Sequence, residues 1–138
     1  MDAAAVKIRL KSIMQETEET FAYEGRCRQK GTLYCITYTD LSDSSLTRVR
    51  IDAGPGGMTL HRQGAITARM QFDPDRTTSV KYRIDAFSTD FLLKTNEYRY
   101  SCNGSSIHIF LDYALFEASG ETVSQGRQEM EIIFRAPQ

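Results

Sequence analysis

Apolar and polar residues alternate with a period of two along most of the chain. At the start, Val6, Ile8 and Leu10 are each followed by a charged residue. This spacing is typical of a strand with one buried and one wet face. Similar patterns predict about ten strands, over residues 6–11, 19–30, 32–40, 45–53, 58–63, 65–72, 77–87, 91–100, 106–118 and 130–134. No helical pattern of ten or more residues interrupts them, because residues 11–20 lack a buried stripe.

Turn-forming residues separate these segments. Gly54-Pro55-Gly56-Gly57 and Asp73-Pro74-Asp75 cannot continue a ladder. We predict further reversals at Ser88-Thr89-Asp90 and at the hairpin signal Asn103-Gly104. Short connections between consecutive strands favour one up-and-down antiparallel barrel of about eight to ten strands, since closure removes exposed sheet edges. A two-sheet β-sandwich is the alternative.

Length and composition fit a single domain over residues 1–138. The chain has 41% hydrophobic and 25% charged residues, so global disorder is excluded. A net charge of −1 with mixed signs argues against a nucleic-acid or anionic membrane partner. Arg26, Arg28 and Lys30 are therefore interpreted as part of a solvated face.

The cysteines and the N-terminal segment indicate the compartment. An odd count of three cysteines without a CxxC pair predicts free thiols, as in a reducing environment. The first residues show no signal-peptide pattern, and no apolar run approaches the roughly 18 residues that span a bilayer. We expect a cytoplasmic protein.

Four features resemble the YwiB-like family, small bacterial proteins of unknown function with a calycin-type, lipocalin-like barrel. They are Arg62-Gln63-Gly64-Ala65, Tyr82, the alternating run Ile107–Leu115 and the closing segment Met130–Phe134. The resemblance implies the fold and a bacterial cytoplasmic origin, and it implies no activity. The chain departs from the family at Phe87–Phe91, which lacks a glycine and is one residue longer, so we expect a local difference in that hairpin.

An arginine falls on the inward parity of a short strand. If the parity of Met58 and Leu60 persists, Arg62 points into the barrel, where a guanidinium is costly unless paired. Glu97 shares the parity of the inward residues before it and is its predicted partner. Arg62 then either orients an anionic ligand or closes one barrel end structurally.

Phenols also fall on inward positions. Tyr82 and Tyr113 suit a ligand-binding lumen, but the pattern favours a packed core in which each phenol keeps one polar group. The candidate ligand-binding residues of the lumen are Arg62, Tyr82, Glu97 and Tyr113.

The remaining chemistry is sparse. His61 and His108 lie opposite the apolar parity of their strands and are expected on the surface. Two histidines and three scattered cysteines match no zinc spacing, and the glycine cluster matches no phosphate-binding motif. We assign no catalytic residue, no metal and no cofactor.

Three functions remain open. The first is binding of a small hydrophobic or carboxylate-bearing ligand in the lumen. The second is a homodimer or protein-interaction module with a filled barrel, using Phe110, Phe116 and Ile133 on the outer parity. The third is a small-molecule lyase or isomerase acting through the lumen tyrosines and arginine.

Overall fold

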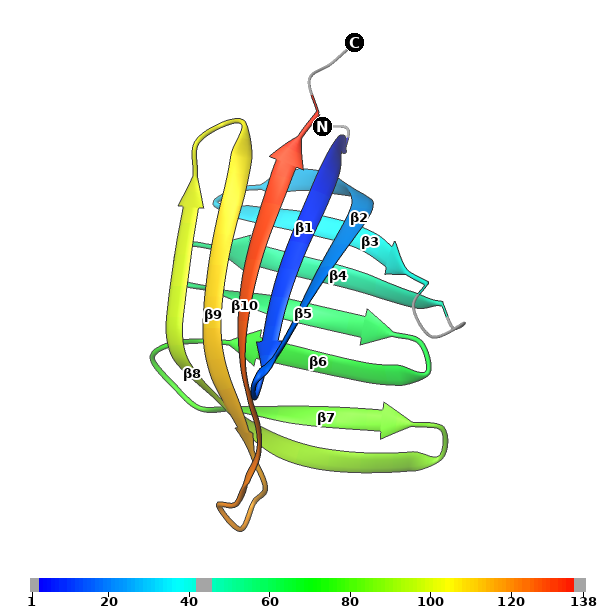
Figure 1. The fold of residues 1–138 in the computed structure, drawn as a ribbon, viewed down its shortest axis with the longest axis vertical. Helices are drawn as coiled ribbons and strands as arrows, with labels where there is room; N and C mark the ends of the chain where they lie inside the picture. The colour runs from blue at the N-terminus through cyan, green and yellow to red at the C-terminus, as the bar shows by residue number, and fades with distance from the viewer. Residues whose placement is uncertain (1–2, 42–45, 136–138) are drawn as a thin grey trace.

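The computed structural model describes residues 3–41 and 46–135, and these form ten strands (Figure 1). The strands are β1 (Ala4–Met14), β2 (Thr17–Lys30), β3 (Leu33–Asp40), β4 (Thr47–Gly54), β5 (Gly57–Gln63), β6 (Ile66–Phe72), β7 (Thr78–Ile84), β8 (Phe87–Cys102), β9 (Ser106–Phe116) and β10 (Thr122–Phe134).

Every strand pairs antiparallel with the next one in the chain, and the first pairs with the last. The closing ladder runs from Val6 opposite Phe134 to Met14 opposite Gly126. The sheet is therefore one closed barrel, which confirms the predicted all-β up-and-down fold. The two-sheet sandwich is not formed, because no break divides the described strands into separate sheets.

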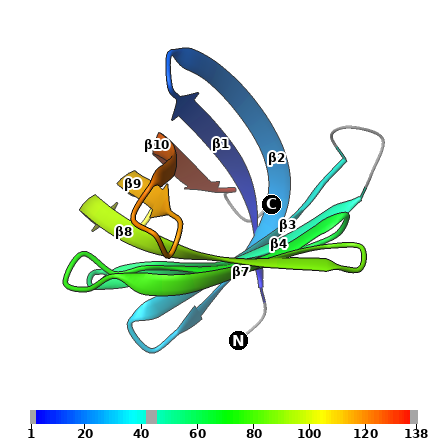
Figure 2. The same cartoon turned by 90° about the horizontal axis from the view of Figure 1, so that it is seen from below.

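Two long strands form the corners of the barrel. The first part of β2 pairs with β1, and its last part pairs with β3. In the same way β8 pairs first with β7 and then with β9. The barrel consequently has two walls that cross at an angle, one made of β3 to β7 and the other of β9, β10 and β1 (Figure 2).

Local features allow each corner to bend. Gly25 lies where β2 passes from β1 to β3, and a Cβ there would stand 2.3 Å from the Thr37 carbonyl oxygen. In β8 a bulge between Thr95 and Glu97 shifts the register against β9. Glycines and bulges are usual where a barrel strand turns a corner.

Two turns differ from the sequence prediction. The predicted reversal at Ser88-Thr89-Asp90 is wrong, because these residues lie within β8 and the chain reverses at Asp85, whose φ is 53°. Aspartate tolerates this left-handed conformation better than most residues. The Asn103-Gly104 hairpin is in the predicted place, but Asn103 is bonded to Ser106, so Gly104 and Ser105 form the two-residue loop.

Side chains of the inner face fill one end of the barrel. The largest fully buried side chains are Val6, Ile8, Ile36, Ile51, Phe72, Val80, Leu93, Ile107, Leu111 and Ile132. Apart from Leu93 and Leu111 they are β-branched or aromatic, types that suit a pleated, enclosed surface. Further along β1 the inward residues become less buried, and Met14 is exposed. The other end of the barrel is therefore less densely filled.

We predict that Gly25→Ala destabilises the protein by about 1–3 kcal/mol, the usual cost of overpacking. The new methyl group would collide with backbone at Thr37, which cannot move without disturbing the ladder. Gly56→Ala is the matched control, because no atom lies within 4 Å of the place its methyl group would take. Urea unfolding measures both variants, and equal midpoints would contradict the assignment of Gly25 to the corner.

A second prediction concerns the bulge. The Thr95 hydroxyl is buried without a hydrogen-bond partner in the described part of the chain. Thr95→Val should stabilise the protein by about 1 kcal/mol, because it removes an unsatisfied polar group at nearly constant shape. Thr78→Val is the control and should destabilise, since the Thr78 hydroxyl donates to the Gln71 carbonyl at 2.8 Å. A Thr95→Val protein that unfolds at lower urea than the parent would refute the prediction.

Candidate functional site

The less filled end of the barrel encloses a cavity of about 340 Å³. Its wall comes from both barrel walls and from the β2 corner. The residues that line it include Leu10, Met14, Phe21, Tyr23, Tyr38, Asp40, Leu60, Arg62, Met70, Phe72, Tyr82, Tyr113 and Gln128. The interior is therefore neither fully packed nor fully open.

Arg62 lies inside this cavity, as the parity of β5 predicts. It pairs with Val49 of β4 and Ala68 of β6, both buried on the inner face. The guanidinium has no hydrogen-bond or ion-pair partner among the residues that the structure describes. An arginine in a partly desolvated cavity without an ion pair to a carboxylate is an energetic cost that a bound anion would offset.

Four phenols share the cavity with Arg62, and Tyr23 among them is bonded to Asp40. Tyr82 and Tyr113 were expected there, and the structure adds Tyr38 and Tyr23. Edge-to-face contacts fix Tyr82 against Phe91 and Tyr113 against Phe72. Such ring pairs hold their geometry well. The phenols therefore present hydroxyl groups from fixed positions.

The hydroxyls are weakly engaged by the protein. Tyr82 donates to the Met70 sulfur at 3.6 Å, and Tyr113 donates to the Met14 sulfur at 3.8 Å. The Tyr38 hydroxyl has no hydrogen-bond partner within the described ranges. A thioether is a weak acceptor, so a ligand oxygen would compete with it easily.

Burial keeps these phenols neutral. Burial raises the pKa of Tyr113 to about 12, with the nearby Tyr82 adding to the rise and Arg62 opposing it. Burial also raises the pKa of Tyr38 and of Tyr82, and the charge of Arg62 again lowers both. At neutral pH all three groups are hydrogen-bond donors rather than bases, and all three lie within the field of Arg62.

A carboxylate completes the polar wall. The Tyr23 hydroxyl donates to Asp40 at 3.2 Å, and its ring stacks on Tyr38 with centroids 4.5 Å apart. The sequence pattern alone did not lead us to place Tyr38 or Asp40 in the lumen, although both continue the inward parity of Ile36 along β3. That parity was the signal that could have found them.

Glu97 is not part of the cavity, and its predicted pairing with Arg62 is wrong. The bulge after Thr95 reverses the parity of β8, so Glu97 points outward and forms an ion pair with Arg99 at 2.7 Å. Tyr98 takes the inward position instead and donates to the Gly54 carbonyl at 2.6 Å. A bulge inserts one residue into the alternation, and the sequence carried no mark of it.

Apolar side chains extend the inner face beyond the cavity. Ile66 pairs with Ile84, and Ile84 pairs with Phe87, one step outward from the pair formed by Ala68 and Tyr82. All three side chains are exposed, and Phe87 is 78% accessible. We call these three residues the apolar rim.

The outward aromatic residues do not form the single patch that was expected. Phe110 is covered by the Arg99 guanidinium, which lies 4.2 Å from the ring centroid. Phe116 lies six positions further along β9, about 20 Å away by strand rise. A homodimer stays a prediction, without a shared surface from Phe110, Phe116 and Ile133.

Both histidines point outward, as predicted. His108 lies 3.7 Å from Glu131, and its ring contacts the Ser106 hydroxyl at 3.1 Å. Partial burial, then Arg50 and Arg69, lower the pKa of His61. In the described residues no cluster of His, Cys, Asp and Glu is placed to bind a metal ion, and no helix there is long and apolar enough to cross a membrane.

We predict that Tyr113→Phe reduces the loss of stability at alkaline pH. The pKa of Tyr113 is about 12 in the folded protein, above the usual value near 10. The neutral phenol therefore contributes stability that is complete below about pH 10 and is lost as pH rises toward 12. Urea midpoints at pH 8 and pH 11 should differ less for Tyr113→Phe than for the parent protein. An equal difference in the two proteins would contradict this.

Comparison with known proteins supports the fold and assigns a family. A family model described as a domain of unknown function, DUF1934, matches residues 6–132. The crystal structure of the ywiB protein from Bacillus subtilis is similar with a TM-score of 0.82, 14% sequence identity and coverage of 97% of this chain and 94% of that chain. No curated protein matches the chain. The resemblance to the YwiB-like family is thus confirmed, and the chain belongs to the DUF1934 family of domains of unknown function.

Proposed function

We propose that the protein binds a small hydrophobic monocarboxylate in the barrel cavity. The observation that carries the proposal is Arg62, an unpartnered guanidinium, within the described residues, among aromatic and apolar side chains. A carboxylate would accept two parallel hydrogen bonds from it in a site with little competing water. The same contact would offset the cost of enclosing the charge.

The surrounding phenols support a ligand with an acidic head. Tyr38, Tyr82 and Tyr113 are neutral donors in the field of Arg62 because burial raises the pKa of each. A carboxylate oxygen is a better acceptor than the two methionine sulfurs that Tyr82 and Tyr113 now use. The head group would therefore gain neutral hydrogen bonds in addition to the charged one.

Asp40 restricts the choice of ligand. Its carboxylate lines the same cavity and is held by the Tyr23 hydroxyl. A second carboxylate on the ligand would meet this negative charge in a region of low dielectric constant. The site therefore favours a monocarboxylate over a dicarboxylate of similar size.

The apolar rim suits the rest of the ligand. Ile66, Ile84 and Phe87 prolong the inner face toward solvent, so a chain or ring leaving the cavity would cover exposed apolar surface. The cavity volume of about 340 Å³ is near the lower end of small-molecule pockets, which span roughly 300–1,000 Å³. Cys27, Cys35 and Cys102 are free, which suits a reducing compartment such as a bacterial cytoplasm.

A ligand panel tests the proposal. Calorimetry and thermal shift would compare medium-chain and aromatic monocarboxylic acids with the corresponding alcohols and dicarboxylic acids. We expect the monocarboxylates to bind and to raise the melting temperature, because a ligand of the folded state stabilises it. The alcohols and dicarboxylates should bind at least about tenfold more weakly, a difference of about 1.4 kcal/mol.

Arg62→Gln should reduce the affinity for monocarboxylates by about tenfold or more, and it should leave the affinity for the alcohols unchanged. Arg83→Gln is the matched control, since Arg83 lies next to Tyr82 on β7 and points to the outside. Equal affinity of the parent and Arg62→Gln for every acid would overturn the proposal. So would the absence of any binding by a parent protein that is folded by circular dichroism.

A further inference from the structure

The outer face of the β3–β7 wall and the adjoining part of β2 carries a row of six side chains, and four of them are arginine or lysine. The ladders place Arg26 opposite Thr37, Thr37 opposite Arg50, Arg50 opposite His61, His61 opposite Arg69, and Arg69 opposite Lys81. One residue comes from each of six consecutive strands. Residues directly opposite in a ladder lie on the same face, so these side chains form one line across the sheet.

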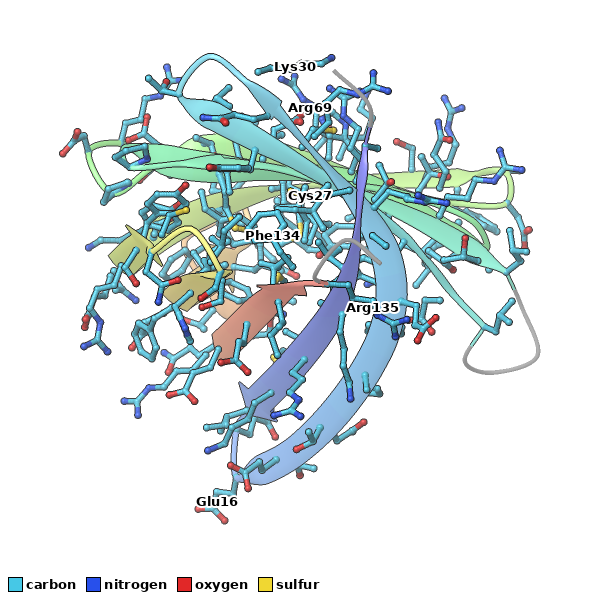
Figure 3. The ribbon with its side chains drawn as sticks, turned by 90° about the horizontal axis from the view of Figure 1, so that it is seen from above. Glu16, Cys27, Lys30, Arg69, Phe134 and Arg135 are labelled. Carbon is cyan, nitrogen blue, oxygen red and sulfur yellow. The ribbon has the colours of Figure 1, made fainter. Side chains whose placement is uncertain are left out.

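Flanking positions on the same face add further cations. They are Arg28, Lys30, Arg48 and Arg83. We call this whole set, with the row itself, the basic face. Figure 3 shows Lys30 and Arg69 on the outer side of the wall, and Cys27 and Phe134 on the inner side.

Carboxylates neutralise only part of the basic face. Asp52 pairs with Arg50 at 2.9 Å, and Glu24 pairs with Arg135. Asp90 lies opposite Lys81 in the ladder without forming an ion pair. Within the described ranges, Arg26, Arg48 and Arg69 have no carboxylate partner.

On the opposite wall, made of β9, β10 and β1, most of the basic side chains form ion pairs. Arg9 pairs with Glu131, Lys11 with Glu18 and Glu129, and Arg127 with Asp112. The near-zero net charge of the chain therefore conceals an asymmetry, with ion-paired charges on one wall and excess positive charge on the other. The pKa of His61 is lowered by partial burial and by Arg50 and Arg69, which agrees with a positive field along the row.

The basic face is hollowed at one end. A depression of about 660 Å³ lies over β1 to β5, and Arg26, Arg48, Arg50, His61 and the paired Glu24 and Arg135 contribute to its wall. A convex polyanion could enter such a depression, whereas a flat bilayer could not. Among the outward positions of the described strands β2 to β7, Leu33 is the one large apolar residue that is exposed. This face therefore offers little apolar surface to insert into lipid.

We propose that the basic face binds the phosphate backbone of a nucleic-acid duplex. Six strands at about 4.8 Å spacing give a row of about 24 Å, which spans about seven base pairs at 3.4 Å each. A small phosphorylated molecule would need only a few converging cations, not a row of this length. The described outward positions of β2 to β7 carry no Phe, Tyr or Trp, and binding to single strands usually relies on stacking on such large rings.

The inference reverses the expectation drawn from composition. Mixed charge along the chain argued against a nucleic-acid partner, and Arg26, Arg28 and Lys30 alone are a short run. The excess becomes apparent only when the register brings Arg50, Arg69 and Lys81 beside them. The threonine and histidine side chains in the same row can donate additional hydrogen bonds to phosphate oxygens.

Fluorescence anisotropy with labelled 20-base-pair DNA and RNA duplexes tests the proposal. We expect binding at about 50 mM salt that weakens steeply toward 200 mM. The double variant Arg69→Gln with Lys81→Gln should lower the slope of log affinity against log salt by about 2, whatever the sequence of the duplex. The matched control, Lys7→Gln with Lys94→Gln, removes the same charge from outside the basic face and should leave the slope unchanged.

Parallel arms separate the other sources of phosphate. Anionic phosphatidylglycerol vesicles, inorganic phosphate and a single-stranded oligonucleotide are titrated under the same conditions. Binding to vesicles, phosphate or the single strand without duplex binding would overturn the proposal, as would equal salt slopes for the two double variants. Arg62→Gln should bind duplex like the parent, so this result is distinguishable from failure of the cavity proposal.

Discussion

The pairing of β1 with β10 is the interaction on which the rest of this structure depends. It gives the sheet an inside, because alternate side chains of every strand then share one enclosed volume. Two bends make this pairing possible, one at Gly25 in β2 and one at the bulge in β8. An open sheet of the same strands would leave one apolar face in water and two unpaired edges.

The same registers that enclose the core also create two chemically different surfaces. His61 and Arg62 are neighbours in β5 and point to opposite sides of the wall. Arg62 joins the tyrosines of the cavity, while His61 joins the basic face between Arg50 and Arg69. A shift of β5 by one residue would exchange the two side chains and destroy both arrangements, since side chains alternate strictly along a strand.

Much of the fold and part of the cavity follow from the sequence alone. Period-two alternation is sufficient to predict the barrel and the inward positions of Arg62, Tyr82 and Tyr113. It fails at Glu97 because one inserted residue reverses the parity, and a bulge has no reliable local signal. The basic face could not be predicted, because it depends on which residues of different strands lie opposite one another. That register comes from the complete set of ladders rather than from any single segment.

Arg62 and the incomplete packing around it are departures from what stability alone would favour. A leucine at this position would continue the apolar alternation of Met58 and Leu60, and it would need no counter-ion. The barrel closes through the ladder of β1 with β10, and β5 is not part of that ladder, so closure does not require the arginine. Sequences usually break local rules where function demands it. A charged residue at an inward position, facing neutral phenols and an apolar rim, is such a break. It supports a ligand-binding role more strongly than either the volume of the cavity or the fold would alone.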